Sequence, residues 1–309
     1  MADEIQPKLV KLYSTVPNSA SILEGVQRGR REYLIKLKEY GLLQKHTSHI
    51  STVHAYDDVE VQAFILAIPS DGNLEEMSVK SLLTYGSHFI DDFLDRPDLE
   101  PGLDTLSRHR RNIKELLDSI GDVGKFAHFL AQKTRHPDGV YRGLQLMAYA
   151  ALIHLARTKK EQETYLEEHK QFNLAEASEE LRTDIISMSN VAHWLSTKTA
   201  QEIWFGVEPK YNSNLALLWN LIYSPALYLH DAHEEKQKGE LNFYGNKLPT
   251  LDEMIFMIDV AAKHIKMHQD DRLEQRLLQL RFLRKAFEPV LPRKILESYD
   301  GLERQISLF

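Results

Sequence analysis

The chain has 309 residues, 43% of them hydrophobic, which is enough to bury a large core in one or two domains. Asp and Glu (45) outnumber Lys and Arg (38), and the formal charge of −7 argues against nucleic acid as the main partner. The lack of cysteine excludes disulfides, thiolate metal sites and a cysteine nucleophile. No apolar run reaches the ~18 residues of a membrane span, and the polar N-terminus does not resemble a signal peptide. These features predict a soluble, cytoplasmic protein.

Apolar residues recur at three- and four-residue spacing along most of the chain, which predicts an all-α fold. In chain order the predicted helices cover residues 20–40, 59–68, 74–95, 103–119, 122–134, 139–157, 159–171, 175–205, 211–238, 250–268, 270–287 and 292–306. We expect a break near Ser187–Ser189 and a kink at Pro225, which lacks a backbone N–H. No repeat or linker interrupts the pattern, so residues 1–309 are predicted to form a single-domain bundle of ten or more helices around a deep central cavity.

The predicted helix 74–95 ends in a run of carboxylates. Asp91 and Asp95 lie one turn apart on one face, Asp92 lies three residues before Asp95, and Pro97 stops the helix. Like charges at this spacing destabilise a helix by roughly a few tenths of a kcal/mol per pair, so we expect a cation there. Mg²⁺ is suited to this role because it prefers a few carboxylates, several waters and a phosphate. The alternative is a solvated acidic helix end.

A second acidic cluster closes the predicted helix 211–238. Asp231 and Glu235 are one turn apart, Glu234 lies between them, and the preceding residues 217–229 are mostly apolar. Two such helix ends facing each other would form a multi-metal site for a diphosphate, whereas this cluster alone fits a solvated end. Between the two clusters, Lys198 lies in a stretch of small residues and is a candidate contact for an anion, with Arg182 as a second candidate.

The order of these motifs resembles the all-α isoprenoid synthase superfamily, which includes trans-prenyl diphosphate synthases, squalene/phytoene synthases and terpene cyclases. The resemblance covers about residues 80–250 and is carried by Asp91-Asp92-Phe93-Leu94-Asp95, by Lys198-Thr199-Ala200 and by the cluster from Asp231. The run Tyr228–Phe243 is also similar to the large-terpene synthases of bacilli, which act on long prenyl diphosphates.

The resemblance implies a site in which three Mg²⁺ ions bind the diphosphate of an allylic prenyl substrate. The implied metal ligands are Asp91, Asp92, Asp95, Asp231 and Glu235, with Glu234 as an alternative. Lys198, Arg182 and Arg96 are the expected diphosphate contacts, and Asp91, Asp92 and Lys198 are the expected catalytic residues. An apolar cavity would hold the carbocation, with Phe89, Trp194 and Trp204 as aromatic candidates beside it. A homodimer and an apolar product that passes to a membrane are also implied.

Three departures from the family patterns bear on the reaction. Chain-elongating synthases carry a second Asp-Asp-x-x-Asp and an N-terminal Gly-Lys-x-x-Arg-Pro, where this chain has His230–Glu234 and Arg28-Gly29-Arg30-Arg31. The metal-binding triplet of terpene cyclases, aligned on Asp231 and Glu235, places Leu227 at its first position. The missing second-substrate motif favours a terpene synthase that uses one diphosphate, and chain elongation with isopentenyl diphosphate is the alternative. Residues expected to set substrate length are Leu82, Tyr85, Gly86, His88 and Phe89.

Two further interpretations stay open. The His230-Asp231 doublet is also typical of all-α metal phosphohydrolases, for which His49, His54, His128 or His154 would be additional ligands. The other interpretation is a degenerate synthase fold that serves as a non-catalytic partner subunit. Such subunits usually lack the first aspartates.

Overall fold

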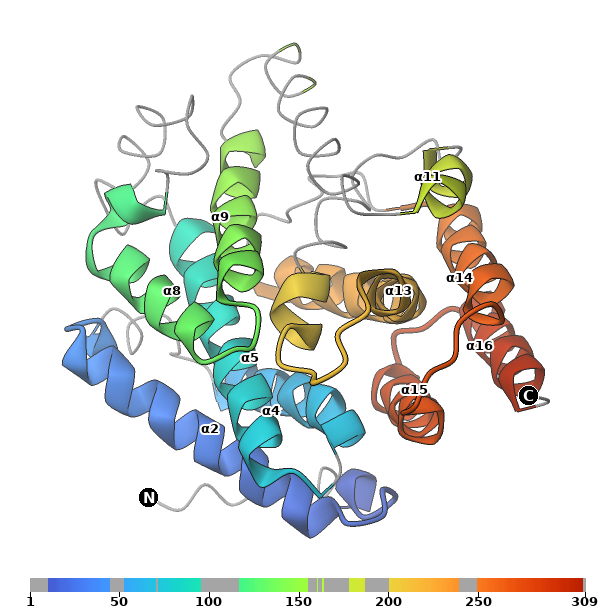
Figure 1. The fold of residues 1–309 in the computed structure, drawn as a ribbon, viewed down its shortest axis with the longest axis horizontal. Coiled ribbons are helices and arrows are strands. Elements are labelled where there is room, and N and C mark those ends of the chain that lie inside the picture. The colour runs from blue at the N-terminus through green and yellow to red at the C-terminus, as the bar shows by residue number, and fades with distance from the viewer. Residues whose placement is uncertain are drawn as a thin grey trace.

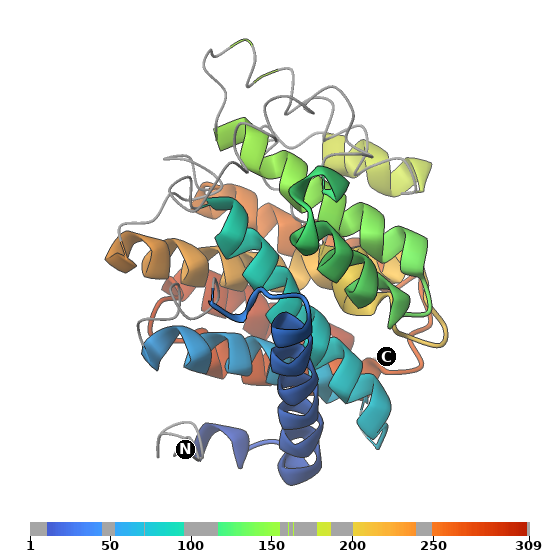
Figure 2. The same cartoon turned by 90° about the vertical axis from the view of Figure 1, so that its left-hand side faces the viewer.

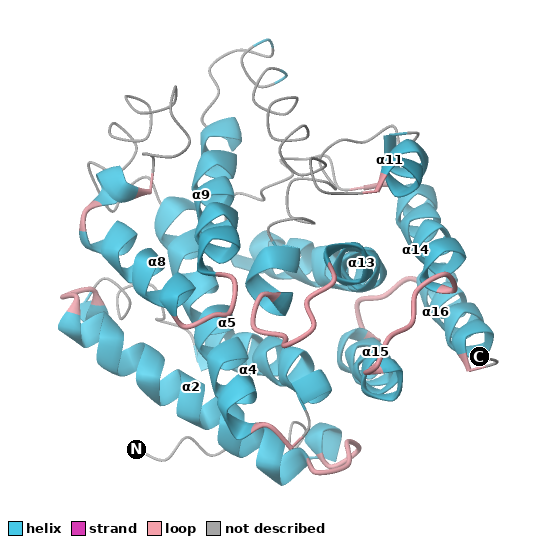
Figure 3. Cartoon of the chain, viewed as in Figure 1, coloured by secondary structure: helices cyan, strands magenta, loops and turns pink. Residues whose placement is uncertain are grey.

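The computed structural model describes residues 11–44, 53–70, 72–95, 117–154, 178–186, 200–238 and 249–307, together with Lys160 and Glu163. Every regular element in these residues is a helix, as Figure 3 shows. The predicted all-α fold with ten or more helices is therefore confirmed. Most of the predicted helices 103–119 and 159–171 lie outside the described residues. No helix in the described ranges is both long and apolar enough to cross a membrane.

In the N-terminal half, one long helix makes contact with four others (Figure 1). This helix is α5 (Leu74–Asp95), and its neighbours are α2 (Ser19–Glu39), α4 (Val53–Ala67), α8 (Asp122–Gln132) and α9 (Pro137–His154). Two short 3-10 turns, η1 (Ile68–Ser70) and η3 (Asp118–Ile120), precede α5 and α8. The bounds of α5 agree with the sequence prediction at both ends. Helix α4 begins six residues earlier than predicted.

In the C-terminal half, α13 (Ser213–Lys238) packs against α14 (Leu251–Ile265) and α15 (Leu273–Phe287), and α16 (Arg293–Ile306) covers α14. The predicted helix 175–205 is represented by α11 (Glu179–Ile186) and a short helix at 200–205, while residues 187–199 lie outside the described part. A capping box starts α14, because the Thr250 hydroxyl accepts from the Glu253 amide and the Glu253 carboxylate accepts from the Thr250 amide.

Glycines allow two neighbours to approach α5 closely. A Cβ on Gly29 of α2 would lie 2.3 Å from the Ser78 carbonyl oxygen and 2.8 Å from the Leu82 amide of α5. A Cβ on Gly86 of α5 would lie 2.4 Å from the Leu130 side chain of α8. The short contacts of Gly29 are with backbone atoms, so that crossing requires glycine, whereas a larger side chain at residue 86 would require Leu130 to shift.

A buried network of charges joins α5 to α15. Arg272, the residue before α15, binds both carboxylate oxygens of Glu76 at 2.6 and 3.1 Å. Lys80, which is 2% exposed, bridges Glu76 and Glu208 at 3.2 Å each. Arg276 contacts both oxygens of Glu208 at 2.7 Å. These pairs fix the start of α5 against the C-terminal helices, although residues 76 and 272 are almost 200 positions apart in sequence.

The protonation of this network follows from its pairing. Burial alone would raise the pKa of Glu76, but the hydrogen bond from Arg272 and the charge of Lys80 outweigh it and lower the pKa to about 2. Burial lowers the pKa of Lys80, opposed by the charges of Glu208 and Glu76. The pKa of Glu208 is lowered because Lys80 and Arg276 outweigh the effect of its burial. The carboxylates therefore stay ionised inside the protein.

Candidate functional site

The first acidic cluster forms the C-terminal end of α5. Asp91, Asp92 and Asp95 all belong to this helix, whose last turn contains no basic residue. Asp91 is exposed, and the side chains of Asp92 and Asp95 lie outside the described part. A helix C-terminus carries partial negative charge, so carboxylates there are unfavourable by about 0.3–1 kcal/mol each unless a cation compensates them. The position of the cluster therefore strengthens the expectation of a cation.

The second acidic cluster belongs to the last third of α13. Asp231, Glu234 and Glu235 are helical in backbone conformation, and their side chains lie outside the described part. His230, directly before them, packs its ring edge-on against Phe287 of α15 with 4.4 Å between the ring centroids. This contact anchors the helix against α15 just before the cluster begins.

The two acidic helix ends lie on the same side of the bundle. Figure 2 shows the C-terminal ends of α5 and α13 both toward the left of the view. The sequence alone could not show this, because it gives helix lengths but not helix directions. Carboxylate oxygens from two such ends are the donor set that Mg²⁺ accepts. Among the described residues no three His, Asp or Glu side chains form a metal site, and five of the six predicted ligands have side chains outside that set.

The predicted basic contacts are divided between different parts of the molecule. Lys198 and Arg96 lie outside the described residues. Arg182 is half-buried on α11, whose Asp184 accepts hydrogen bonds from Lys263 and, over 2.6 Å, from His264 of α14. In Figures 1 and 2, α11 lies on the opposite side of the view from the C-terminal end of α5. The structure does not bring Arg182 to the acidic ends.

A line of polar residues follows the face of α5 that carries Asp91. Residues at three- and four-residue spacing before Asp91 share its face, namely Glu76, Lys80, Thr84, Ser87 and His88. Thr84 and Ser87 are buried and donate hydrogen bonds to the carbonyl oxygens of Lys80 and Thr84 at 2.8 and 3.1 Å. His88 Nδ1 lies 2.8 Å from the Thr84 carbonyl oxygen. A buried polar stripe therefore leads from the ion network to the acidic end.

The opposite face of α5 packs against α2 and α8. Tyr85 stacks on Tyr33 with ring centroids 5.5 Å apart, and Phe89 meets Phe126 edge-on at 5.9 Å. Gly86 lies against α8, as described above. Tyr85, Gly86 and Phe89, which the sequence suggested as residues that set substrate length, therefore serve as packing contacts. Of the aromatic candidates, Trp204 lines a small apolar cavity and Trp194 lies outside the described part.

The described residues do not show the predicted deep central cavity. Between α4, α13 and α15 there is a small space of about 10 Å³, lined by Trp204, Tyr223 and Leu227 among others. That is room for one water at most. Phe64, Phe282 and other aromatic side chains fill the surrounding core. The segments 96–116, 187–199 and 239–248, which adjoin the predicted site residues in sequence, lie outside the described part.

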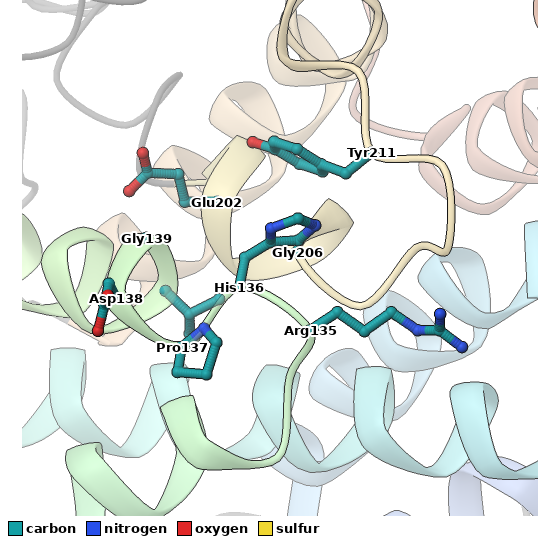
Figure 4. A pocket seen from close by; sticks show the side chains of 9 residues that line it. Arg135, His136, Pro137, Asp138, Gly139, Glu202, Gly206 and Tyr211 are labelled. Atoms are coloured by element: carbon teal, nitrogen blue, oxygen red, sulfur yellow. The ribbon is translucent and has the colours of Figure 1, made fainter.

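A larger pocket of about 330 Å³ lies at the start of α9, shown in Figure 4. The buried Glu202, the ring of Tyr211 and the ring of His136 line it, and the two rings are 4.7 Å apart. Gly206 shapes it, because a Cβ there would lie 2.8 Å from Val140. None of the residues predicted for the diphosphate site lines this pocket, and sequence reasoning did not identify it. Neither Glu202 nor Tyr211 belongs to a recognisable motif.

The N-terminal arginine run is used for packing and surface charge. Gly29 forms the crossing with α5, and Arg30 lies 3.9 Å from the carboxylate of Glu60. Arg28 and Arg31 are exposed on the outside of α2. These placements favour no second diphosphate site here.

The rival metal site built on His230 gains no support from the described residues. His128 hydrogen bonds to Asp118 over 2.8 Å and stacks on Tyr141, and it is on α8 rather than beside α13. The side chains of His49, His54 and His154 lie outside the described part. Comparison with protein families, with curated proteins and with solved structures found no match to this chain.

Proposed function

We propose that this chain is a Mg²⁺-dependent isoprenoid synthase that ionises an allylic prenyl diphosphate, releases diphosphate and converts the carbocation into a terpene. The observation that carries the proposal is the placement of two carboxylate clusters at the ends of α5 and α13, on one side of the bundle (Figure 2). The all-α fold and the resemblance of the ordered motifs support it. The role of a non-catalytic partner subunit is the competing interpretation.

The assigned roles follow from the chemistry of each residue type. Asp91, Asp92 and Asp95 would hold Mg²⁺ from α5, and Asp231 with Glu235 or Glu234 would hold it from α13. Bound there, the metal supplies positive charge that stabilises the diphosphate as it leaves. Lys198 would add a donor to the same group, as would Arg96. Asp91, Asp92 and Lys198 are the residues whose loss should affect turnover most.

Chain elongation is the second candidate, favoured by the sequence Lys198-Thr199-Ala200. It requires a site for isopentenyl diphosphate. The placement of the Arg28–Arg31 run argues against such a site there, because Gly29 packs on α5 and Arg30 pairs with Glu60. A terpene synthase that uses one diphosphate therefore stays the preferred assignment.

The test is to incubate the protein with Mg²⁺ and farnesyl or geranylgeranyl diphosphate, with and without isopentenyl diphosphate, and to assay diphosphate release and organic products. We expect release without isopentenyl diphosphate. If a longer prenyl diphosphate forms only when isopentenyl diphosphate is added, the protein is a chain-elongating synthase. No turnover of either substrate would refute the proposal and favour the partner-subunit role.

The matching site test compares Asp91→Ala and Asp92→Ala with Glu274→Ala, a change at an exposed carboxylate at the start of α15. We expect each aspartate variant to lower turnover by about a hundredfold or more, with unchanged helical circular dichroism. Glu274→Ala should keep its activity. Near wild-type rates in either aspartate variant would show that the metal assignment is wrong.

A further inference from the structure

The outward face of α2 carries a stripe of positive charge. Arg28, Arg31 and Lys38 are exposed and follow one another at three- and seven-residue spacing, so they share one face of the helix. Ile35 lies between them and is 56% exposed. At 1.5 Å rise per residue the stripe from residue 28 to residue 38 is about 15 Å long. Figure 2 shows α2 in front of the rest of the molecule, with no described helix covering it.

Apart from Glu24, the other charges of α2 are neutralised by described partners, which leaves this stripe with a net positive charge. Lys36 pairs with Glu39 at 2.6 Å, and Lys133, the residue after α8, pairs with Glu32 at 2.6 Å. Arg30 points inward to Glu60. By contrast, Arg28, Arg31 and Lys38 make no ion pair with any described residue. Glu24, one turn before Arg28, is the one acidic residue on this face that no described cation neutralises.

We propose that this face of α2 docks on an anionic lipid bilayer. Exposed cations around an exposed aliphatic side chain are the arrangement by which a helix lies on a charged membrane, with the cations at the headgroups and the aliphatic group below them. Because the chain as a whole carries −7, a negative surface repels its other faces and orients α2 toward the bilayer. Two copies of the stripe would repel each other, which disfavours a second copy of the chain as the occupant. The proposal does not depend on the catalytic site.

The experiment measures partition of the full chain onto phosphatidylcholine vesicles with and without about 30 mol% phosphatidylglycerol, by sedimentation. The test variant is the triple change Arg28→Gln, Arg31→Gln, Lys38→Gln. The matched control removes three exposed cations of α15 and α16 that form no ion pair with a described residue, in the changes Lys285→Gln, Lys294→Gln, Arg304→Gln. Both triple variants change the net charge by the same amount. A difference in their vesicle binding therefore reports where the charges lie and not how many there are.

We expect the wild type to bind only the anionic vesicles, and to be released when salt is raised from about 0.05 M to about 0.5 M. Each cation near the surface accounts for about a fivefold change in partition, so the α2 triple variant should lose about a hundredfold and the control variant much less. Ile35→Ser should weaken binding without changing its salt dependence. All substituted positions are exposed, so folding should be preserved.

Three results would overturn the proposal. One is the absence of wild-type partition onto the anionic vesicles at low salt. Another is an equal loss in the two triple variants, which would show a non-specific effect of net charge. The last is binding to a soluble polyanion such as poly-glutamate in preference to the vesicles, which would assign the stripe to an acidic protein partner instead.

Discussion

The hydroxyl of Tyr299 on α16 donates a hydrogen bond over 2.9 Å to the backbone carbonyl oxygen of Ile222 on α13. Burial raises the pKa of this hydroxyl, which keeps it protonated as a donor. Pro225, one turn of α13 after Ile222, has no N–H and interrupts the backbone hydrogen bonds of the helix. The buried hydroxyl therefore stabilises α13 at its weakest point, and the helix continues to Lys238 with the second acidic cluster.

Replacing Tyr299 with Phe should lower the free energy of unfolding by about 1–3 kcal/mol, because a buried carbonyl loses its donor. The measurement is urea unfolding followed by circular dichroism. Tyr40→Phe is a suitable control, since the Tyr40 ring packs on Phe126 and Phe129 and its hydroxyl makes no hydrogen bond with a described residue. A Tyr299→Phe variant within about 0.5 kcal/mol of the wild type would show that the proline is accommodated without this contact.

Glu76 gives the stability of the protein a dependence on acid. Its pKa is about 2 in the folded protein against 4.5 ordinarily, because Arg272 and Lys80 hold it ionised. A lowered folded pKa contributes stability that is complete above about pH 4.5 and is lost as pH falls toward 2. The shift corresponds to about 3 kcal/mol.

We expect Glu76→Gln to be destabilised by about 3 kcal/mol at pH 7, and the difference from the wild type to shrink as pH approaches 2. Urea unfolding of both proteins across this pH range measures the difference in their free energies of unfolding. Glu297→Gln is the control, because Glu297 forms an exposed pair with Arg293 and should change stability by less than about 1 kcal/mol at any pH. A constant difference for Glu76→Gln across the range would show that its carboxylate does not titrate as described.

The positions of the helices could be predicted from the sequence, whereas their packing could not. The apolar spacing before Asp91 and the stop at Pro97 predict α5 with its observed bounds, since both signals are local. The contact of Gly29 with Ser78 is not local. Periodicity shows that a helix has an apolar face but not which helix covers it. For this reason the Arg28–Arg31 run could be likened to a diphosphate-binding motif from its sequence, although its glycine lies at a helix crossing.

In the candidate site, too, the features with local sequence signals could be predicted and those that depend on packing could not. The acidic clusters were predicted because carboxylates so closely spaced are unusual in a helix, and the structure adds that both helix ends lie on one side of the bundle. Lys80 and Arg276 were not singled out, because a charged residue on an amphipathic helix normally lies at the surface. Their burial depends on Glu76 and Glu208, which come from distant parts of the chain. A line of polar residues at four-residue spacing through Glu76, Lys80 and Thr84 was the signal that could have indicated it.

Carboxylates at the end of α5 should reduce the stability of the metal-free protein. Their charges repel each other and oppose the partial charge of the helix terminus. The double variant Asp91→Asn, Asp92→Asn should therefore lose this repulsion together with the proposed metal ligands. Added Mg²⁺ should raise the melting temperature of the wild type but not of this variant. Asp122→Asn, at the start of α8, should be destabilising, because a carboxylate at a helix N-terminus is favourable. Equal responses to Mg²⁺ in wild type and double variant would place the cation elsewhere.

The different surroundings of the two faces of α5 lead to a prediction that rests on the proposed function. Ser87 and His88 share the face of Asp91, whereas Tyr85 and Phe89 pack against α2 and α8. A substrate that lies along the face of Asp91 would contact the first pair, so Ser87→Ala and His88→Ala should change the distribution of products. Phe89→Leu should instead leave the products unchanged and lower stability by about 1 kcal/mol, because it loosens an aromatic contact. Gas chromatography of the products and thermal unfolding measure the two effects. A product change in Phe89→Leu, without one in Ser87→Ala or His88→Ala, would place the substrate on the other face of α5.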